Sequence, residues 1–255
     1  MTFTVENFEF FLLILVRITG FVYTAPFFSL KNVPVRLKVG FSIFISIILF
    51  QTTSYETLTY SGVMGFAIFA TKEVMVGVIM GLFSNIAYHI LAFAGHLIDM
   101  EIGFSMVNQL DPVSQIETTI TANLYGYLVL LMMIVTNLHH YFITAIVDSF
   151  QVIPVGDVVF HPEMYLVMVR FVTDYFIIGF RIVLPVFASI LIVNTILAIL
   201  AKVAPQMNMF VVGMQLKVFV GLIVLTLIIG LIPSVADFIF NEMITMLKAS
   251  IEMMV

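Results

Sequence analysis

Residues 95–121 read GHLIDMEIGFSMVNQLDPVSQIETTIT and form a polar interruption in an otherwise apolar chain. The stretch lies near the middle of the sequence, and it carries Asp and Glu but no Lys or Arg. Gly103 and the Asp111–Pro112 pair interrupt any helix that runs through it. A breakable polar segment between membrane-grade helices is tolerated only where protein or a water-filled cavity surrounds it. We therefore expect this stretch to line or close a path.

The composition on either side is that of an integral membrane protein. Of the 255 residues, 62% are hydrophobic and 10% are charged, whereas soluble domains carry roughly a quarter charged residues. The chain has no Cys, which excludes disulfides, thiolate metal sites and cysteine nucleophiles. Its net charge of −5 comes from scattered acidic residues without a basic patch. Binding to nucleic acid is therefore not expected.

Charges near the start of the chain predict its orientation. Glu6 and Glu9 stand where a secretory signal would carry Lys or Arg, so we expect the first segment to remain in the mature protein. Lys31, Arg36 and Lys38 then form a short basic loop. Such loops stay in the cytoplasm, which places the amino terminus on the outside.

The apolar pattern predicts an all-α fold of about six hydrophobic segments. They cover residues 8–30, 39–50, 62–98, 122–147, 164–201 and 218 onward, and 39–50 is too short to cross a bilayer by itself. Pro26, Pro185 and Pro233 predict kinked or broken helices. Gly77 and Gly81 have the GxxxG spacing that permits close helix contact. The last two segments form a hairpin whose turn contains Lys202, Pro205 and Lys217 and lies inside.

Several charged residues fall within or beside these apolar segments, among them Arg17, Lys72 and Glu73. Each would cost about 2.5–3.5 kcal/mol at the centre of a bilayer, so they are expected to be paired, hydrated or outside the hydrocarbon. Arg170, Asp174 and Arg181 have spacings that place them on one helical face. This face is interpreted as a polar stripe toward a neighbouring subunit or a conduit. The alternative is an internal salt bridge plus an arginine that reaches a lipid headgroup. Arg17 and Asp99 complete the candidate set of buried polar groups.

No pattern of a catalytic, nucleotide or metal site is found. The histidines, including His89, His96 and the His139–His140 pair, lack the spacing of HExxH and similar ligand sets. Walker, GxGxxG and GxSxG motifs are absent from the sequence. We therefore expect no enzyme activity, cofactor or metal. Met106, beside the breakable segment, is interpreted as a flexible residue that helps to seal a gap.

The segment KVAPQMNMFVVGMQLK, residues 202–217, resembles the signature of the FliR/SctT family of type III secretion export-gate subunits. Three further regions also resemble the family and follow one another in the same order along the chain. These are VRITGFVYTAPFFS (16–29) with VPVRLK (33–38), GHLIDMEIGFSMVNQLDP (95–112) and NLHHYFITAIVDSFQVIPVG (137–156). The chain differs at Leu138, where the family usually has Gly, and at Met214–Gln215, where it often has Phe-Pro.

The resemblance implies one copy of this chain in a hetero-oligomeric ring with FliP and FliQ, in the inner membrane at the flagellar basal body. It implies packed helical hairpins, with parts of the ring on the periplasmic side of the bilayer. Residues 1–163 would be a FliP-like part and residues 164–255 a FliQ-like hairpin. FlhB would face the hairpin turn, FlhA would lie nearby, and unfolded substrates would pass through the ring.

The resemblance also assigns roles to residues. A plug would span about 103–118, including Gly103, Phe104, Met106, Leu110, Asp111 and Pro112. The partner-facing hairpin turn would comprise Lys202, Pro205, Gln206, Met207, Asn208 and Lys217. Alternatives are an export-gate subunit of a virulence injectisome, or a secondary transporter that uses the intramembrane Arg and Asp residues. A transporter usually shows internal repeats, and none is found in this sequence.

Overall fold

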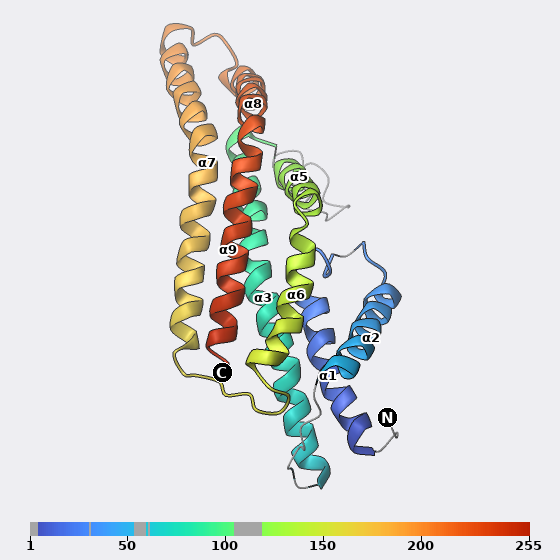
Figure 1. Ribbon diagram of the computed structural model, residues 1–255. Coiled ribbons are helices and arrows are strands. Elements are labelled where there is room, and N and C mark those ends of the chain that lie inside the picture. The colour runs from blue at the N-terminus through green and yellow to red at the C-terminus, as the bar shows by residue number, and fades with distance from the viewer. Residues whose placement is uncertain (1–4, 31, 54–59, 61, 105–118) are drawn as a thin grey trace. The chain divides into compact units, whose positions relative to one another are not determined.

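The computed structural model describes residues 5–30, 32–53, 60, 62–104 and 119–255, and these residues form helices without a strand (Figure 1). The expected all-α fold is therefore confirmed. The elements are α1 (Val5–Thr24), α2 (Val35–Thr52), α3 (Gly62–Ile102), α5 (Ile120–Val135), α6 (Leu138–Val152), α7 (Met164–Val203), α8 (Met209–Ile228), the 3-10 turn η1 (Ile229–Leu231) and α9 (Ile232–Glu252).

The chain forms two compact units. The first comprises Met1–Ala87, Ile134–Phe171 and Phe240–Val255, and the second comprises Tyr88–Met133 and Val172–Ile239. The long helices α3 and α7 each contribute residues to both units. The FliP-like and FliQ-like parts predicted from the resemblance divide the chain elsewhere, after residue 163. That division concerns family likeness and stays a prediction.

Glycine residues bring α1 and α3 of the first unit into close contact. A Cβ atom on Gly77 would lie 2.0 Å from the carbonyl oxygen of Arg17, and one on Gly81 would lie 2.8 Å from the backbone nitrogen of Ala25. On the other helix, a Cβ on Gly20 would lie 2.8 Å from the carbonyl oxygen of Val74. The GxxxG prediction of a close helix contact is thus confirmed, and its partner is α1 of the same chain.

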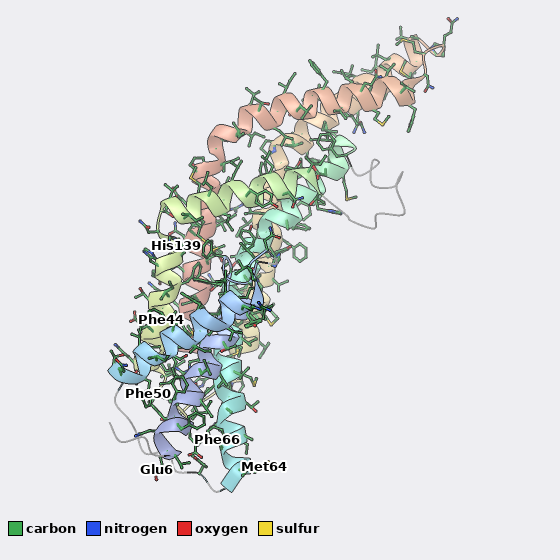
Figure 2. All side chains as sticks on the ribbon, turned by 90° about the vertical axis from the view of Figure 1, so that its right-hand side faces the viewer. Glu6, Phe44, Phe50, Met64, Phe66 and His139 are labelled. Carbon is green, nitrogen blue, oxygen red and sulfur yellow. The ribbon has the colours of Figure 1, made fainter. Side chains whose placement is uncertain are left out.

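Helix α2 buries three polar residues and exposes several large apolar ones. Lys38, Ser42 and Ser46 are buried, whereas Phe44 and Ile48 are 64% and 47% exposed. Phe44 is labelled on this helix in Figure 2. The two serine hydroxyls donate to the carbonyl oxygens four residues earlier, so they are satisfied within the helix. Because a soluble protein rarely exposes so many large apolar side chains, the outer face of α2 belongs against lipid or another apolar surface.

Two expectations about this region are wrong. The helix begins at Val35, directly after Pro34, and its 18 residues make it long enough to be a candidate membrane span. Arg36 and Lys38 therefore lie in the helix and not in a loop. Lys38 is tolerated there because its ammonium lies 5.7 Å from the centre of the Tyr23 ring.

Length and composition give four candidate membrane spans in the described part of the chain, Val35–Thr52, Gly62–Ile102, Met164–Val203 and Met209–Glu252. A fifth arises if the bent pair Ile120–Val135 and Leu138–Val152 counts as one span. The six expected apolar segments correspond to α1, α2, α3, the α5–α6 pair, α7 and the stretch from α8 to α9. Of these, α1 carries Glu6, Glu9 and Arg17 and is not among the candidate spans.

The helix breaks differ in part from those that proline predicts. Pro26 lies just beyond the end of α1, and Pro233 lies in the first turn of α9 after the 3-10 turn. Pro185 lies inside α7, which continues to Val203. The sharpest break, a bend of 70° between α5 and α6, occurs without proline. Asn137 enables it by adopting the left-handed conformation, with φ of 58°, which Asn tolerates better than most residues.

Candidate functional site

Arg17 of α1 is fully buried and pairs with the equally buried Glu73 of α3. The Nε group of Arg17 donates to Glu73, and its Nη1 donates to the carbonyl oxygens of Ser149 at 3.3 Å and Ile153 at 2.9 Å. The guanidinium carbon lies 4.2 Å from the centre of the Phe150 ring. The end of α6 is thus joined to α1 and α3 through a single side chain.

The second oxygen of Glu73 extends this network into the chain that follows α6. It accepts the backbone N–H of Gly156 at 2.8 Å. One residue earlier in α3, Lys72 donates to the carbonyl oxygen of Val158 at 3.1 Å. Two charges that are costly in an apolar segment therefore hold the loop between α6 and α7. Sequence reasoning marks Arg17, Lys72 and Glu73 as misplaced charges but does not find these partners.

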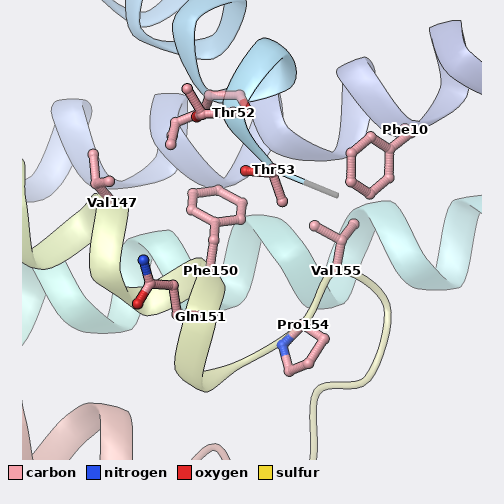
Figure 3. Close-up of a pocket in the computed structure, with 9 residues that line it drawn as sticks. Phe10, Thr52, Thr53, Val147, Phe150, Gln151, Pro154 and Val155 are labelled. Carbon is pink, nitrogen blue, oxygen red and sulfur yellow. Dashed lines mark hydrogen bonds between the residues drawn. The ribbon is translucent and has the colours of Figure 1, made fainter. Parts of the chain in front are cut away.

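A cavity of about 390 Å³ lies in the first unit, beside this network (Figure 3). Phe10, Phe150 and Val155 supply apolar walls, and Thr52, Thr53 and Gln151 supply the polar ones. No titratable side chain lines it among the described residues.

Asp99 of α3 holds the first turn of α5 in the second unit. Both of its carboxylate oxygens lie 3.2 Å from the backbone nitrogen of Thr121, and one also accepts the hydroxyl of Thr121. A carboxylate is favoured at a helix N-terminus because it accepts free N–H groups and faces the positive end of the helix dipole. Asp99 is 2% exposed and is satisfied within the chain. The polar stretch that begins at Gly95 therefore starts as packed helix.

The helix break that Gly103 predicts is present at the end of α3. α3 ends at Ile102, and Gly103 follows with φ of 98°, a conformation that glycine adopts readily. Phe104 is half-buried. The other predicted plug residues, Met106, Leu110, Asp111 and Pro112, lie outside the described residues. The plug role of this segment stays a prediction.

The late hairpin turn is shorter than expected. α7 runs to Val203 and α8 begins at Met209, so the turn holds Pro205, Gln206, Met207 and Asn208, all exposed. Lys202 lies in the last turn of α7. Lys217 lies within α8, which corrects its placement in the turn. The reason is that Asn208 caps α8 through a hydrogen bond of 3.4 Å from the Val211 N–H, and Gly213 alone does not interrupt the helix.

The charged residues of α7 differ in exposure. Arg170 and Arg181 are exposed, and Asp174 is half-buried. Arg170 belongs to the first unit, whereas Asp174 and Arg181 belong to the second. Their predicted role toward a neighbouring subunit or conduit stays a prediction. Among the described residues, no three His, Cys, Asp or Glu side chains form a group that could hold a metal ion.

Comparison with known proteins relates this arrangement to a family. The family model described as bacterial export proteins, family 1, matches residues 8–243. This chain belongs to that family. The match includes every candidate residue named above, from Arg17 to Lys217.

Relatives within this export family share nearly their whole length with the chain. Flagellar biosynthetic protein FliR of Bacillus subtilis is 32% identical over 93% of this chain and 92% of its own length. FliR of Escherichia coli is 27% identical over 91% of this chain and 89% of its own length. FliR of Aquifex aeolicus is 30% identical over 85% of this chain and 83% of its own length. The family match over residues 8–243 spans the Arg17 network, the Asp99 cap and the late hairpin together.

Proposed function

We propose that this chain is a non-enzymatic core subunit of the flagellar type III export gate. In this proposal it forms, with FliP and FliQ, the channel through which unfolded flagellar proteins cross the inner membrane. FlhB and FlhA would act beside it on the cytoplasmic side. The end-to-end likeness to the FliR of Bacillus subtilis carries the proposal, because it covers 93% of this chain.

The chemistry of the described residues supports a structural role. The buried charges Arg17, Glu73 and Asp99 are used in pairing and capping within the chain. The exposed face of α2 and much of α7 and α8 is apolar, as expected of helices that are covered by lipid or sister subunits. A channel subunit needs these features and does not need a catalytic group. The driving energy would come from other parts of the apparatus.

Complementation tests the proposal directly. The chain is expressed in a Bacillus subtilis strain that lacks its own FliR, and the export of flagellin into the medium is measured. We expect export to be restored, and we expect FliP and FliQ to copurify with a tagged copy from membranes. The matched control is the same chain with the first helix, Val5–Thr24, deleted.

The readout also separates the alternatives. Failure to restore export, together with purification as a single subunit that transports a small solute, would show a secondary transporter. Restored secretion of injectisome substrates without flagellin would show a virulence system. Stable membrane levels of the chain are measured in each strain, so that a lost signal is not confused with degradation.

A further inference from the structure

Charged residues bracket an uncharged band in the late hairpin. Residues 182–201 of α7 carry no charge between Arg181 and Lys202, and residues 218–236 carry none between Lys217 and Asp237. At about 1.5 Å per residue the α7 stretch is roughly 30 Å long, which matches the hydrocarbon core of a bilayer. α7 as a whole has 40 residues and is about twice that length. If this stretch crosses a bilayer, its length brings Arg181 to the level of a lipid headgroup, at the end of the band away from Lys202.

An apolar cavity of about 370 Å³ opens beside Arg181 within the second unit. Its walls include Leu91, Val129, Ile182 and Phe238, contributed by α3, α5, α7 and α9. Its polar groups are few, namely Tyr125, Ser234 and Arg181 itself. The volume lies in the range of small-molecule sites, roughly 300–1,000 Å³.

Arg181 supplies a positive charge at this cavity without an internal counter-ion. Among the described residues it forms no ion pair, and no acidic side chain lines the cavity. Asp237 is close in sequence to the lining residues Ser234 and Phe238, but it neither lines the cavity nor pairs with Arg181. A charged side chain in or beside hydrocarbon is expected to have a partner. Because Arg181 is exposed, an anion from outside the described chain can reach its guanidinium.

We propose that this cavity binds one anionic phospholipid, with its phosphate on Arg181 and an acyl chain in the apolar interior. Guanidinium binds phosphate through two parallel N–H···O bonds, which fixes the headgroup at the cavity mouth. Basic pockets between membrane helices are known to take anionic lipid headgroups. Free phosphate matches the charge but leaves the apolar volume unfilled. A net-neutral phospholipid such as phosphatidylcholine also carries a phosphate, but its own ammonium group already neutralises that phosphate, so its headgroup brings no net negative charge to Arg181. An anionic phospholipid satisfies both parts of the site.

The test uses the full chain with its copurifying subunits, extracted from bacterial membranes in mild detergent. Delipidated protein is exposed to phosphatidylglycerol or to phosphatidylcholine, and retained lipid is counted by native mass spectrometry. We expect phosphatidylglycerol to be retained about tenfold or more over phosphatidylcholine, as one charged hydrogen-bonded contact allows. Inorganic phosphate at millimolar concentration should not displace it, because phosphate has no acyl chain. Equal retention of both lipids, or displacement by phosphate, overturns the proposal.

Variants assign the effect to this cavity. Arg181→Gln should lower the retention of phosphatidylglycerol to the level seen with phosphatidylcholine. Ser234→Phe should lower the retention of both lipids, because the larger side chain fills the cavity. The matched control is Arg170→Gln, an exposed arginine of the same helix that does not line the cavity. Unchanged retention in Arg181→Gln contradicts the proposal.

A photoreactive amino acid at the exposed position 231 distinguishes lipid from protein as the occupant. Crosslinks to phospholipid support the site, and crosslinks to a copurifying polypeptide instead overturn it. The wild-type comparison of the two lipids needs no variant, so the test stands even if a substitution prevents folding. Flagellin export is scored separately, and failure of the lipid site leaves the proposed export role unaffected.

Discussion

Arg17 illustrates how this protein keeps a full charge in its interior. Its guanidinium is completely buried, yet it meets a carboxylate, carbonyl oxygens and an aromatic face. Burying two charges costs several kcal/mol each, and their attraction offsets this only when both are present. Removal of one partner is therefore more harmful than removal of both.

Substitution of the pair should show this asymmetry. Glu73→Gln and Arg17→Met should each destabilise the protein by about 3–5 kcal/mol, because each leaves an uncompensated polar or charged group in the interior. The double variant Arg17→Met/Glu73→Leu should be less destabilised than either single variant. The measurement is unfolding in mild detergent, supported by the amount of chain in membranes.

Arg36→Met is the control, because Arg36 is an exposed arginine in the first turn of α2. It should change stability by less than about 0.5 kcal/mol, as surface substitutions usually do. Strictly additive losses in the double variant would show that Arg17 and Glu73 act independently, contrary to the geometry.

The sequence predicts which charged residues are buried, but it does not predict their hydrogen-bond partners. Arg17 and Glu73 are recognisable because each interrupts an apolar segment. Their pairing joins positions 56 residues apart, and the carbonyl partners of Arg17 lie more than 130 residues away. No periodicity relates such positions. The same holds for Asp99, whose partner Thr121 lies 22 residues on, beyond the undescribed segment.

At the level of elements, the contact of α1 with α3 depends on glycine. The backbones approach so closely that a Cβ on Gly77 would overlap the carbonyl oxygen of Arg17. A backbone atom cannot move aside as a flexible side chain can. Any larger residue at position 77 must therefore push the two helices apart.

Gly77→Ala should weaken this contact and destabilise the first unit by about 1–3 kcal/mol, the usual cost of overpacking. The control is Gly40→Ala in α2, where an added Cβ meets nothing within 4 Å. That change should stabilise the helix by about 0.5–1 kcal/mol, because alanine loses less conformational freedom than glycine. Both are measured by unfolding in detergent, and equal effects would exclude a special role for position 77.

The elements themselves are predictable to different degrees. The long apolar helices α3, α7 and α8 follow from composition alone, and the end of α3 at Ile102 follows from Gly103. The start of α2 cannot be predicted in this way, because Arg36 and Lys38 indicate a loop. Only the contact of the Lys38 ammonium with the Tyr23 ring allows Lys38 to be buried in a helix. The break at Asn137 escapes prediction because the left-handed conformation carries a weak signal outside glycine.

For the whole molecule, the proposed function makes the segment between α3 and α5 the closure of a channel. Deletion of residues 105–116 should raise the leakage of ions in cells that express the assembled gate, because a closure that blocks small ions at rest is removed. The measurement is the conductance or ion sensitivity of such cells. The control is an unchanged chain at the same membrane level, and unchanged leakage in the deletion would contradict the plug role.

The glycine contact of the first unit also restricts how the protein can move. If α1 turned and advanced along α3 by one residue, the side chain of Phe21 would take the place of Gly20, where only a hydrogen atom now fits. The two helices therefore share a fixed register, and they travel as one body in any rearrangement. In the proposed export role, any widening of the channel would take place where no such close contact fixes the helices, as at the turn at Gly103 and the bend at Asn137.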